Sequence, residues 1–399
     1  MMTTSKDRPR QADHMTGRER ILAALNRQPV DRIPFVPLLD PYTLMDMPEE
    51  VAGKATGRGL FDPPRMIAAS RVLGCDLMIR HVAATGPLGT GAPHLQSLGG
   101  FAPPIEVKTE FKDGELSETL TTPVGSVRGR WKFTDRVGVI PHQVKYVVNN
   151  YEEMKIFHYA VDHMNTEPVA ANYDAFLEID KMIGDDGIAT ASVSNSPLMF
   201  LIEMAWGLES TYFLLHDHRD EVEDILEKLH ASLKRYVEVL AASPAQVVIQ
   251  YENTSTTLLS PTIFRRYCLP YLNDYADILK GAGKIYLVHM CGTLHSLVDD
   301  IAQGHFNGIC DIAPLPTGDL PLDEAAAKLP GKVVIGGIDA NTFICQDAEF
   351  VKAEVSNLIE RIMPFRGVLL GSGDVTPRGT PVENLRTIRS LIDKLGAYT

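Results

Sequence analysis

The stretch Lys284-Ile-Tyr-Leu-Val-His289-Met-Cys291-Gly292 decides how the rest of the sequence is interpreted. Its apolar run predicts a short buried strand, and a His-x-Cys pair follows at once. Side chains two residues apart on a strand point to the same side, so the imidazole of His289 and the thiolate of Cys291 can meet one ion. Both groups are good zinc ligands. The alternative interpretation is a buried histidine and a small buried cysteine in a hydrophobic core.

The composition is that of a soluble globular protein. The 399 residues suffice for one large or two ordinary domains, and the net charge of -13 argues against nucleic acid or a membrane surface as a partner. No apolar run approaches the roughly 20 residues of a membrane span. Residues 1–15 are polar and charged, which predicts a disordered tail. They lack the apolar core that a signal peptide has. Five scattered cysteines predict reduced thiols in a cytoplasmic protein.

The apolar runs of strand length predict the fold. Eight such runs are bounded by turn residues, at 33–38, 76–80, 187–193, 246–251, 284–289, 307–312, 332–336 and 366–371. Helical patterns separate most of them. This alternation predicts a single (β/α)8 TIM barrel over residues 16–399, an α/β fold. An open doubly wound sheet is the alternative, but no glycine-rich dinucleotide fingerprint follows the first run.

Residues 101–146 interrupt the alternation. They show period-2 patterning with turns at Asp113-Gly114 and Pro123-Val-Gly125. We expect a β-hairpin insertion after the second barrel strand, not a separate domain.

Barrel enzymes carry their chemistry at the C-terminal ends of the strands. Glu252 ends the strand before that of His289, so a Glu252/His289/Cys291 set predicts a zinc site with an open fourth position. Asp339 and Asp374 are the candidate catalytic acids or bases, because they follow the last two strands. The candidate substrate-binding residues at the other strand ends are Asp40, Tyr42, Arg80, Asn195, Asn253 and Ser372.

Four stretches carry a resemblance to a known family. They are Thr16–Asn26 with Asp31-Arg-Ile-Pro34, Glu252-Asn-Thr-Ser-Thr256, Val288-His-Met-Cys-Gly292, and Gly371-Ser-Gly-Asp374 with Thr380-Pro-Val-Glu-Asn384. Together they resemble the uroporphyrinogen decarboxylase superfamily over residues 16–395. The His-x-Cys pair resembles the metal motif of its methyltransferase branch, which includes methylcobamide:coenzyme M methyltransferases and corrinoid-dependent O-demethylase components.

Two departures from the superfamily's patterns narrow what the resemblance implies. The decarboxylases carry Arg-Gln-Ala-Gly-Arg-Tyr after the first strand, whereas residues 37–48 here contain no arginine, which disfavours porphyrinogen decarboxylation. The coenzyme M enzymes take a third cysteine ligand after the last strand, where this chain has Ser372. The third ligand is therefore expected at Glu252.

The resemblance implies a Zn2+-dependent methyltransferase, or demethylase, that moves methyl from a small donor, such as a methoxyarene, to a cobalt(I) corrinoid. The sequence has no Asp-x-His-x-x-Gly cobalamin pattern. The corrinoid is therefore expected free, as cobalamin, or on a separate corrinoid protein. Two alternatives stay open: a metal-independent decarboxylase or lyase, and a non-catalytic ligand-binding barrel. The choice between monomer and homo-oligomer is open as well.

Overall fold

The computed structural model describes residues 14–55, 62–82, 95, 100–133, 142–165 and 171–398. Backbone contacts divide the chain into two compact units. The first unit comprises residues 1–79, 180–188 and 308–399, and the second comprises residues 80–179 and 189–307. Residues 1–13 of the expected tail lie outside the described residues.

The strands of the first unit form a parallel sheet in the order β9-β10-β11. Their bounds are Gly308–Ile312, Val333–Ile338 and Val368–Ser372. Every residue of the three strands is buried, which explains why the sequence shows continuous apolar runs at these places.

The expected first barrel strand, 33–38, is not a regular strand, and this part of the prediction is wrong. Phe35 and Leu38 form only isolated parallel bridges, to Leu370 and Val375. The physical reason is in the sequence, because Pro34 and Pro37 have no N–H to donate to a strand ladder. The segment nevertheless runs beside β11, the position that a barrel gives to its first strand.

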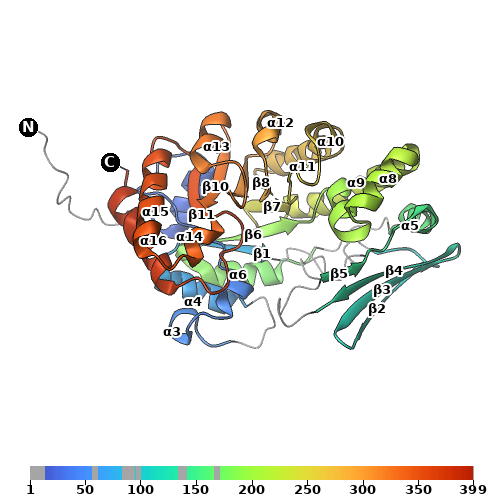
Figure 1. Cartoon of the computed structure of the whole chain (residues 1–399), viewed down its shortest axis with the longest axis horizontal. Coiled ribbons are helices and arrows are strands. Elements are labelled where there is room, and N and C mark those ends of the chain that lie inside the picture. Colours follow the sequence, from blue (N-terminus) through green and yellow to red (C-terminus); the bar gives the residue numbers. More distant parts are fainter. Residues whose placement is uncertain are drawn as a thin grey trace, which may run out of the picture. The chain divides into compact units, whose positions relative to one another are not determined.

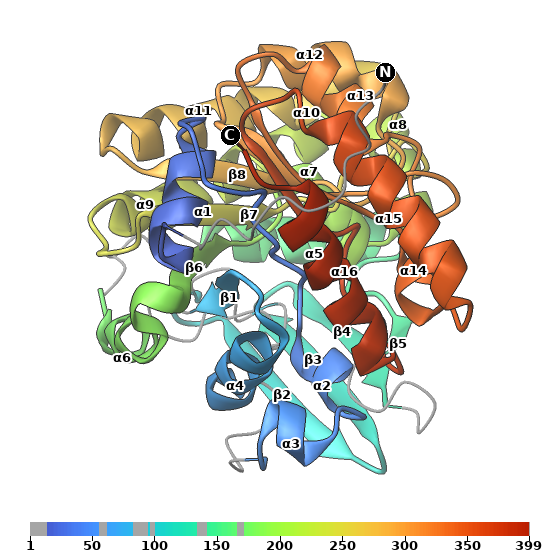
Figure 2. The same ribbon diagram turned by 90° about the vertical axis from the view of Figure 1, so that its left-hand side faces the viewer.

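Helices cover the sheet of the first unit. The last two long helices, α15 and α16, pack against each other and are seen side by side in Figure 2. The helices of this unit are α1 (Gly17–Leu25), α2 (Pro41–Leu44), α3 (Glu49–Ala52), α4 (Pro63–Leu73), α13 (Leu322–Lys328), α14 (Ala340–Ile344), α15 (Ala348–Ile362) and α16 (Val382–Leu395).

The second unit carries the remaining parallel strands, in the order β1-β6-β7-β8. Their bounds are Leu77–Val82, Gly187–Val193, Val247–Tyr251 and Ile285–His289, so β1 and β6 begin in residues assigned to the first unit. The α/β fold with parallel strands is thus confirmed. The described residues contain seven such strands rather than the eight expected.

The helices of the second unit follow its strands in the chain. They are α5 (Tyr151–Asp162), α7 (Pro197–Phe200), α8 (Leu208–Asp217), α9 (Arg219–Ala241), α10 (Pro261–Tyr267), α11 (Leu269–Gly281) and α12 (Val298–Gln303). α6 (Asp174–Ile183) crosses from the second unit into the first.

A four-stranded antiparallel sheet stands where a hairpin was expected. Its order is β2-β3-β4-β5, with bounds Glu106–Lys112, Glu115–Thr122, Gly125–Lys132 and His142–Lys145. It is drawn in teal in Figure 1. Both predicted turns are present as two-residue connections, at Asp113-Gly114 and Pro123-Val124. The sequence therefore located the alternation and its turns, but it underestimated the number of paired strands.

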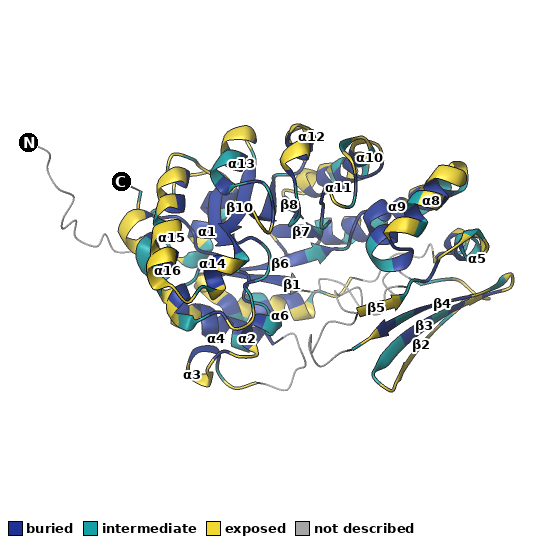
Figure 3. Ribbon diagram, viewed as in Figure 1, coloured by how far each residue is buried: buried dark blue, intermediate teal, exposed yellow. Residues whose placement is uncertain are grey.

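The buried residues are concentrated in the parallel strands. In Figure 3 the strands of the parallel sheets are dark blue, whereas yellow residues gather on the outer faces of the helices. No helix within the described part of the chain is both long and apolar enough to cross a membrane.

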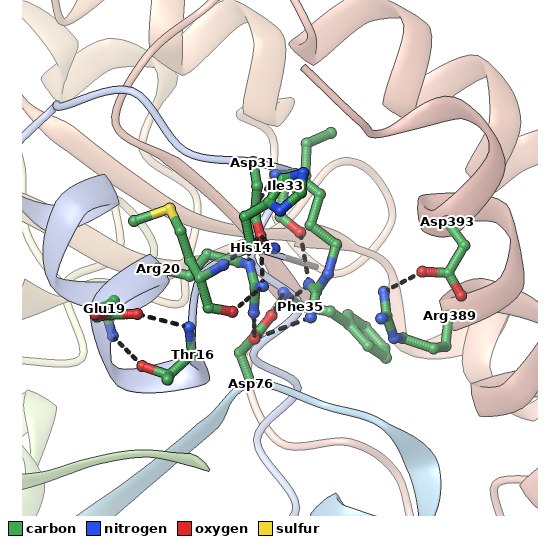
Figure 4. A network of polar contacts seen from close by, with 12 residues as sticks. His14, Thr16, Glu19, Arg20, Asp31, Ile33, Phe35, Asp76, Arg389 and Asp393 are labelled. Atoms are coloured by element: carbon green, nitrogen blue, oxygen red, sulfur yellow. Dashed lines mark hydrogen bonds and ion pairs between the residues drawn. The ribbon is translucent and has the colours of Figure 1, made fainter. Parts of the chain in front are cut away.

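One buried ionic network holds the start of the chain in the first unit (Figure 4). Asp76, which directly precedes β1, accepts hydrogen bonds from the guanidinium groups of Arg20 at 2.5 Å and Arg32 at 2.6 Å. It also accepts from the N–H of Phe35 at 2.9 Å. Asp31 accepts two further hydrogen bonds from Arg20. The network therefore ties α1 and residues 31–35 to the beginning of β1.

Candidate functional site

The candidate site is built at the C-terminal ends of β7 and β8 in the second unit. The two strands pair in parallel, with Tyr251 beside His289, and their rings lie 5.2 Å apart. Just beyond, the N–H of Asn253 donates to the carbonyl oxygen of His289 at 3.0 Å. Glu252 and Asn253 thus lie level with His289, as expected for neighbouring strand ends.

His289 and Cys291 are brought together, although β8 ends at His289 and Cys291 lies two residues beyond the strand. A ring nitrogen of His289 and Sγ of Cys291 lie within 4.8 Å of each other, and His289 is only 4% exposed. Gly292 lets the following loop pack closely, because a Cβ there would lie 2.2 Å from the Cβ of Ser255. The pair offers one nitrogen and one sulfur atom at a shared position, a donor set that suits zinc.

Glu252 is placed differently from the third ligand that the sequence suggested. It is 0% exposed, and its two oxygens accept hydrogen bonds from the N–H of Ser196 at 2.7 Å and the hydroxyl of Ser196 at 2.5 Å. Its oxygens do not complete a group with His289 and Cys291 in which all ligand atoms lie within 4.8 Å. The hydrogen bonds from Ser196 direct the side chain of Glu252 toward the end of β6. The role of Glu252 as a zinc ligand stays a prediction.

Burial raises the pKa of Glu252 to about 8, although the hydrogen bonds from Ser196 favour the charged form. The negative charge of Glu203 adds to the upward shift. Glu252 therefore carries its proton at neutral pH in this structure.

Glu203 is a functional candidate that the sequence analysis missed. It lies in a π-helical turn, Leu201–Ala205, and Oε2 accepts hydrogen bonds from the side-chain amides of Asn195 at 2.9 Å and Asn253 at 2.8 Å. Burial raises its pKa to about 7 against these two hydrogen bonds and the charge of His289. A signal was available, because Glu203 is the one charged residue in the apolar stretch 197–206.

Asn195 and Asn253, both predicted from their strand ends, thus donate to the same carboxyl group, that of Glu203. Asn253 adopts φ 52°, a left-handed conformation that a short polar side chain tolerates better than other residues. Such conformations cluster at functional sites. The structure therefore joins two predicted binding residues through a third that was not predicted.

The predicted residues of the first unit gather at the C-terminal ends of β10 and β11. Ile338 pairs with Ser372, and the N–H of Gly373 donates to the carbonyl oxygen of Ile338 at 2.8 Å. Asp339 directly follows Ile338, and Asp374 comes two residues after Ser372, so both lie at the same edge of the sheet. Asp374 has φ 115°, an unusual conformation for a residue with a side chain.

Several of these side chains also have structural contacts. The hydroxyl of Ser372 accepts a hydrogen bond from the N–H of Leu38 at 3.0 Å. Asp40 caps α2 by accepting from Thr43, and burial raises its pKa. Asp339 caps α14 by accepting from the N–H of Asn341 at 2.8 Å. Their substrate-binding or catalytic roles stay predictions.

Two further predicted substrate-binding residues lie on β1 and α2. Arg80 is buried within β1. Tyr42 lies in α2, with the guanidinium of Arg378 5.8 Å from its ring centre.

Comparison with known proteins identifies the family. Residues 132–395, about two thirds of the chain, match the family model described as uroporphyrinogen decarboxylase (URO-D). The chain belongs to the uroporphyrinogen decarboxylase family. The family expected from the sequence is thereby confirmed.

Two curated relatives of this uroporphyrinogen decarboxylase family member share about a quarter of the aligned residues. It is 25% identical over 172 residues to the uroporphyrinogen decarboxylase of Anaeromyxobacter dehalogenans, covering 43% of this chain and 47% of that protein. It is 26% identical over 175 residues to that of Thermus thermophilus, covering 43% and 48%. The chain thus matches about half the length of these curated relatives.

A solved structure shares the fold along nearly the whole chain. A methyltransferase from Methanosarcina mazei matches with a TM-score of 0.60 and 16% identity, covering 96% of this chain and 99% of that one. At this identity the match supports the fold, and the chemistry has to be argued from the site.

Proposed function

We propose that the protein is a zinc-dependent methyltransferase that moves a methyl group from a small methylated donor, such as a methoxyarene, to a cobalt(I) corrinoid. The single observation that carries the proposal is the approach of His289 and Cys291 at the end of β8, within 4.8 Å. A family member that only decarboxylates has no need for a nitrogen and a sulfur ligand at one position.

His289 and Cys291 would hold the zinc ion, with a carboxylate as the third ligand. Glu252 is the candidate from the second unit, and binding there would require it to lose its proton and turn from Ser196. Zinc with an open position would act as a Lewis acid toward the oxygen of the methyl donor.

The residues around the pair supply orientation and a proton. In the proposed reaction the bond between oxygen and methyl carbon breaks, the methyl group passes to cobalt, and the leaving oxygen needs a proton. Glu203 has a pKa of about 7, so it can hold this proton near neutral pH. The side-chain amides of Asn195 and Asn253 hold its carboxyl group in place.

The corrinoid would come from outside the chain, since the sequence has no Asp-x-His-x-x-Gly cobalamin pattern. A separate corrinoid protein or free cobalamin would therefore deliver the acceptor. The expected location in the cytoplasm fits an acceptor that must be kept reduced.

The test measures bound metal and methyl transfer in the same preparations. The purified protein is analysed for zinc, then incubated with reduced cobalamin and a panel of methoxyarenes and methylamines while methylcobalamin formation is followed by absorbance. We expect about one zinc per chain and methyl transfer from at least one donor. His289→Ala and Cys291→Ser should each lose both zinc and about 99% or more of the rate.

Matched controls are His216→Ala and Cys345→Ser, which replace residues of the same types outside the proposed site. Both should keep full zinc content and full rate. The proposal fails if the His289 and Cys291 variants stay fully active. Turnover of a carboxylated substrate that survives chelation would instead favour the metal-independent decarboxylase.

A further inference from the structure

Two loops of the second unit meet directly beside the His289 and Cys291 pair. Residues 252–257 follow β7, and residues 290–293 follow β8. The last pair in the ladder between the two strands is Tyr251 and His289. Cys291 therefore lies beyond the part of the chain that this ladder holds in place. Other contacts have to bring its Sγ atom to the ring of His289.

The backbones of the two loops are joined on both sides of Cys291. Before it, the N–H of Asn253 donates to the carbonyl oxygen of His289 at 3.0 Å. After it, the N–H of Gly292 donates to the carbonyl oxygen of Thr254 at 3.2 Å. Cys291 is thus held between two points of contact with the loop that follows β7. The second point depends on how closely the two loops approach each other.

The hydroxyl of Ser255 is at the centre of the contacts that follow Cys291. Ser255 is 7% exposed, and its Oγ accepts hydrogen bonds from the N–H of Thr293 at 3.2 Å and the N–H of Thr257 at 3.3 Å. A hydroxyl has two acceptor positions, so only its proton remains to be donated. The hydroxyls of Thr257 and Thr293 lie 2.8 Å and 3.2 Å from it and can accept that proton. The two loops thus supply every partner that this hydroxyl can use.

The approach of the two loops leaves no room for another side chain between them. A Cβ added at Gly292 would lie 2.5 Å from Oγ of Ser255. Thr256 makes two further contacts with Thr293, because its N–H donates to the carbonyl oxygen at 2.9 Å and the two hydroxyls lie 2.6 Å apart. The chain that follows Cys291 is therefore fixed to the β7 loop mainly through hydroxyl groups.

We propose that Ser255 is a positioning residue for the metal site, and that its hydroxyl holds the loop after Cys291 so that Sγ meets the ring of His289 before a metal ion binds. The inference rests on the proposed function in one respect, namely that His289 and Cys291 bind zinc. A loop that is ordered in advance does not have to be ordered when the ion binds, and this raises the affinity. Partners that orient metal ligands act on affinity in the same way.

A purely structural role, in which the hydroxyl only satisfies backbone N–H groups, is the competing explanation. In that case Ser255→Ala destabilises the metal-free and the zinc-bound protein by the same amount, so the zinc affinity does not change. If Ser255 positions Cys291, its loss destabilises the zinc-bound protein more than the metal-free protein. The metal affinity therefore separates the two explanations, whereas stability alone does not.

The test measures the metal affinity of the full chain. Zn2+ binding is followed by competition with a chromogenic chelator, and Co2+ is used as a probe because its charge-transfer absorption reports a thiolate ligand. We expect Ser255→Ala to weaken Zn2+ binding about tenfold or more and to weaken the charge-transfer band of the Co2+ form. Thr293→Val keeps the N–H that donates to Ser255 and loses only the hydroxyl, so it should weaken Zn2+ binding by a smaller factor, about threefold.

Ser260→Ala is the matched control, because Ser260 lies on the same connection after β7. Its hydroxyl accepts from the N–H of Ile263 at 3.3 Å and caps α10, without a contact to the β8 loop among the described residues. Its loss should lower the melting temperature and leave the Zn2+ affinity unchanged. Circular dichroism of each variant shows that the chain is still folded.

The outcomes separate this inference from the proposed function. A Zn2+ affinity of both Ser255→Ala and Thr293→Val within about twofold of wild type overturns the inference and leaves the zinc site intact. A wild type that binds no Zn2+ overturns both. A weakened Zn2+ affinity in Ser255→Ala, in a protein that transfers no methyl group, supports the inference and overturns only the methyltransferase activity.

Discussion

Buried carboxyl groups appear in two regions of this molecule under opposite conditions. In the first unit, Asp76 is 3% exposed and accepts hydrogen bonds from two arginines. In the second unit, Glu252 is 0% exposed, and its hydrogen bonds come from neutral groups, the N–H and hydroxyl of Ser196 and the thiol of Cys268. Burial is the same in both places, and the charge of the partner differs.

Asp31, the other carboxyl group of the ionic network, shows how arginine partners act on a pKa. Burial alone would raise the pKa of Asp31, but the hydrogen bonds from Arg20 and from the N–H of Met15 lower it well below the usual range. Near β7, burial prevails and raises the pKa of Glu203 to about 7 and of Glu252 to about 8. A carboxylate paired with arginine stays charged and serves the fold, whereas an unpaired one can exchange a proton near neutral pH.

The largest effect should come from breaking the ionic network. Asp76→Asn removes the charge that Arg20 and Arg32 share and leaves two buried guanidinium groups poorly compensated. We expect a loss of about 3 to 5 kcal/mol in the free energy of unfolding. Urea denaturation at pH 7 measures it.

Asp186→Asn is the control for this change, because it breaks a pair of the same kind at the surface of the first unit. Asp186 contacts Arg71 at 2.6 Å, and both side chains are about half exposed. Its loss should cost less than about 1 kcal/mol. Equal losses for the two variants would contradict the distinction between buried and exposed pairs.

How much of the site was predictable depends on whether a feature is local. The approach of His289 and Cys291 was expected from the two-residue period of a strand, and it is present even though β8 ends at His289. The position of Glu252 level with His289 follows from consecutive parallel strands. The direction of Glu252 toward Ser196 could not be predicted, because it depends on a loop that comes from a different strand. Local patterns thus predict which residues share an edge, and not which atoms they contact.

The fold shows the same limit. The buried parallel strands were predictable from their apolar runs. The irregular segment 33–38 should also have been predicted, since Pro34 and Pro37 are visible in the sequence. Glu203 was missed because a π-helical turn, which has no sequence period of its own, sets its direction.

Replacing Glu203 should change the free energy of unfolding by an intermediate amount, and the change should depend on pH. The pKa of Glu203 rises from 4.5 to about 7 on folding, so the folded state holds more protons than the unfolded state between these values. Stability therefore falls as pH rises through this window. Glu203→Gln removes that dependence and should be more stable than wild type by about 1 to 2 kcal/mol at pH 8, with little difference at pH 4.

Thermal unfolding at the two pH values measures the change, with Glu209→Gln as the exposed control on α8. A gain at Glu203→Gln that is the same at both pH values would mean that Glu203 is not held as an uncharged group. In the methyl-transfer assay the same variant should lower the rate, since glutamine cannot release a proton.

The smallest change in the free energy of unfolding is expected on replacing Ser196, whose hydroxyl donates to Glu252 at 2.5 Å. Ser196→Ala should cost about 1 kcal/mol at pH 6, where Glu252 is protonated in both proteins. The cost should grow above pH 8, because the lost hydrogen bond favours the charged form and its removal raises the pKa of Glu252 further. Ser192→Ala is the matched control, because the hydroxyl of Ser192 on β6 has no hydrogen-bond partner among the described residues. If Ser196→Ala cost as much as Asp76→Asn, neutral partners would hold a buried carboxyl group as firmly as arginines do, and the contrast between the two regions would fail.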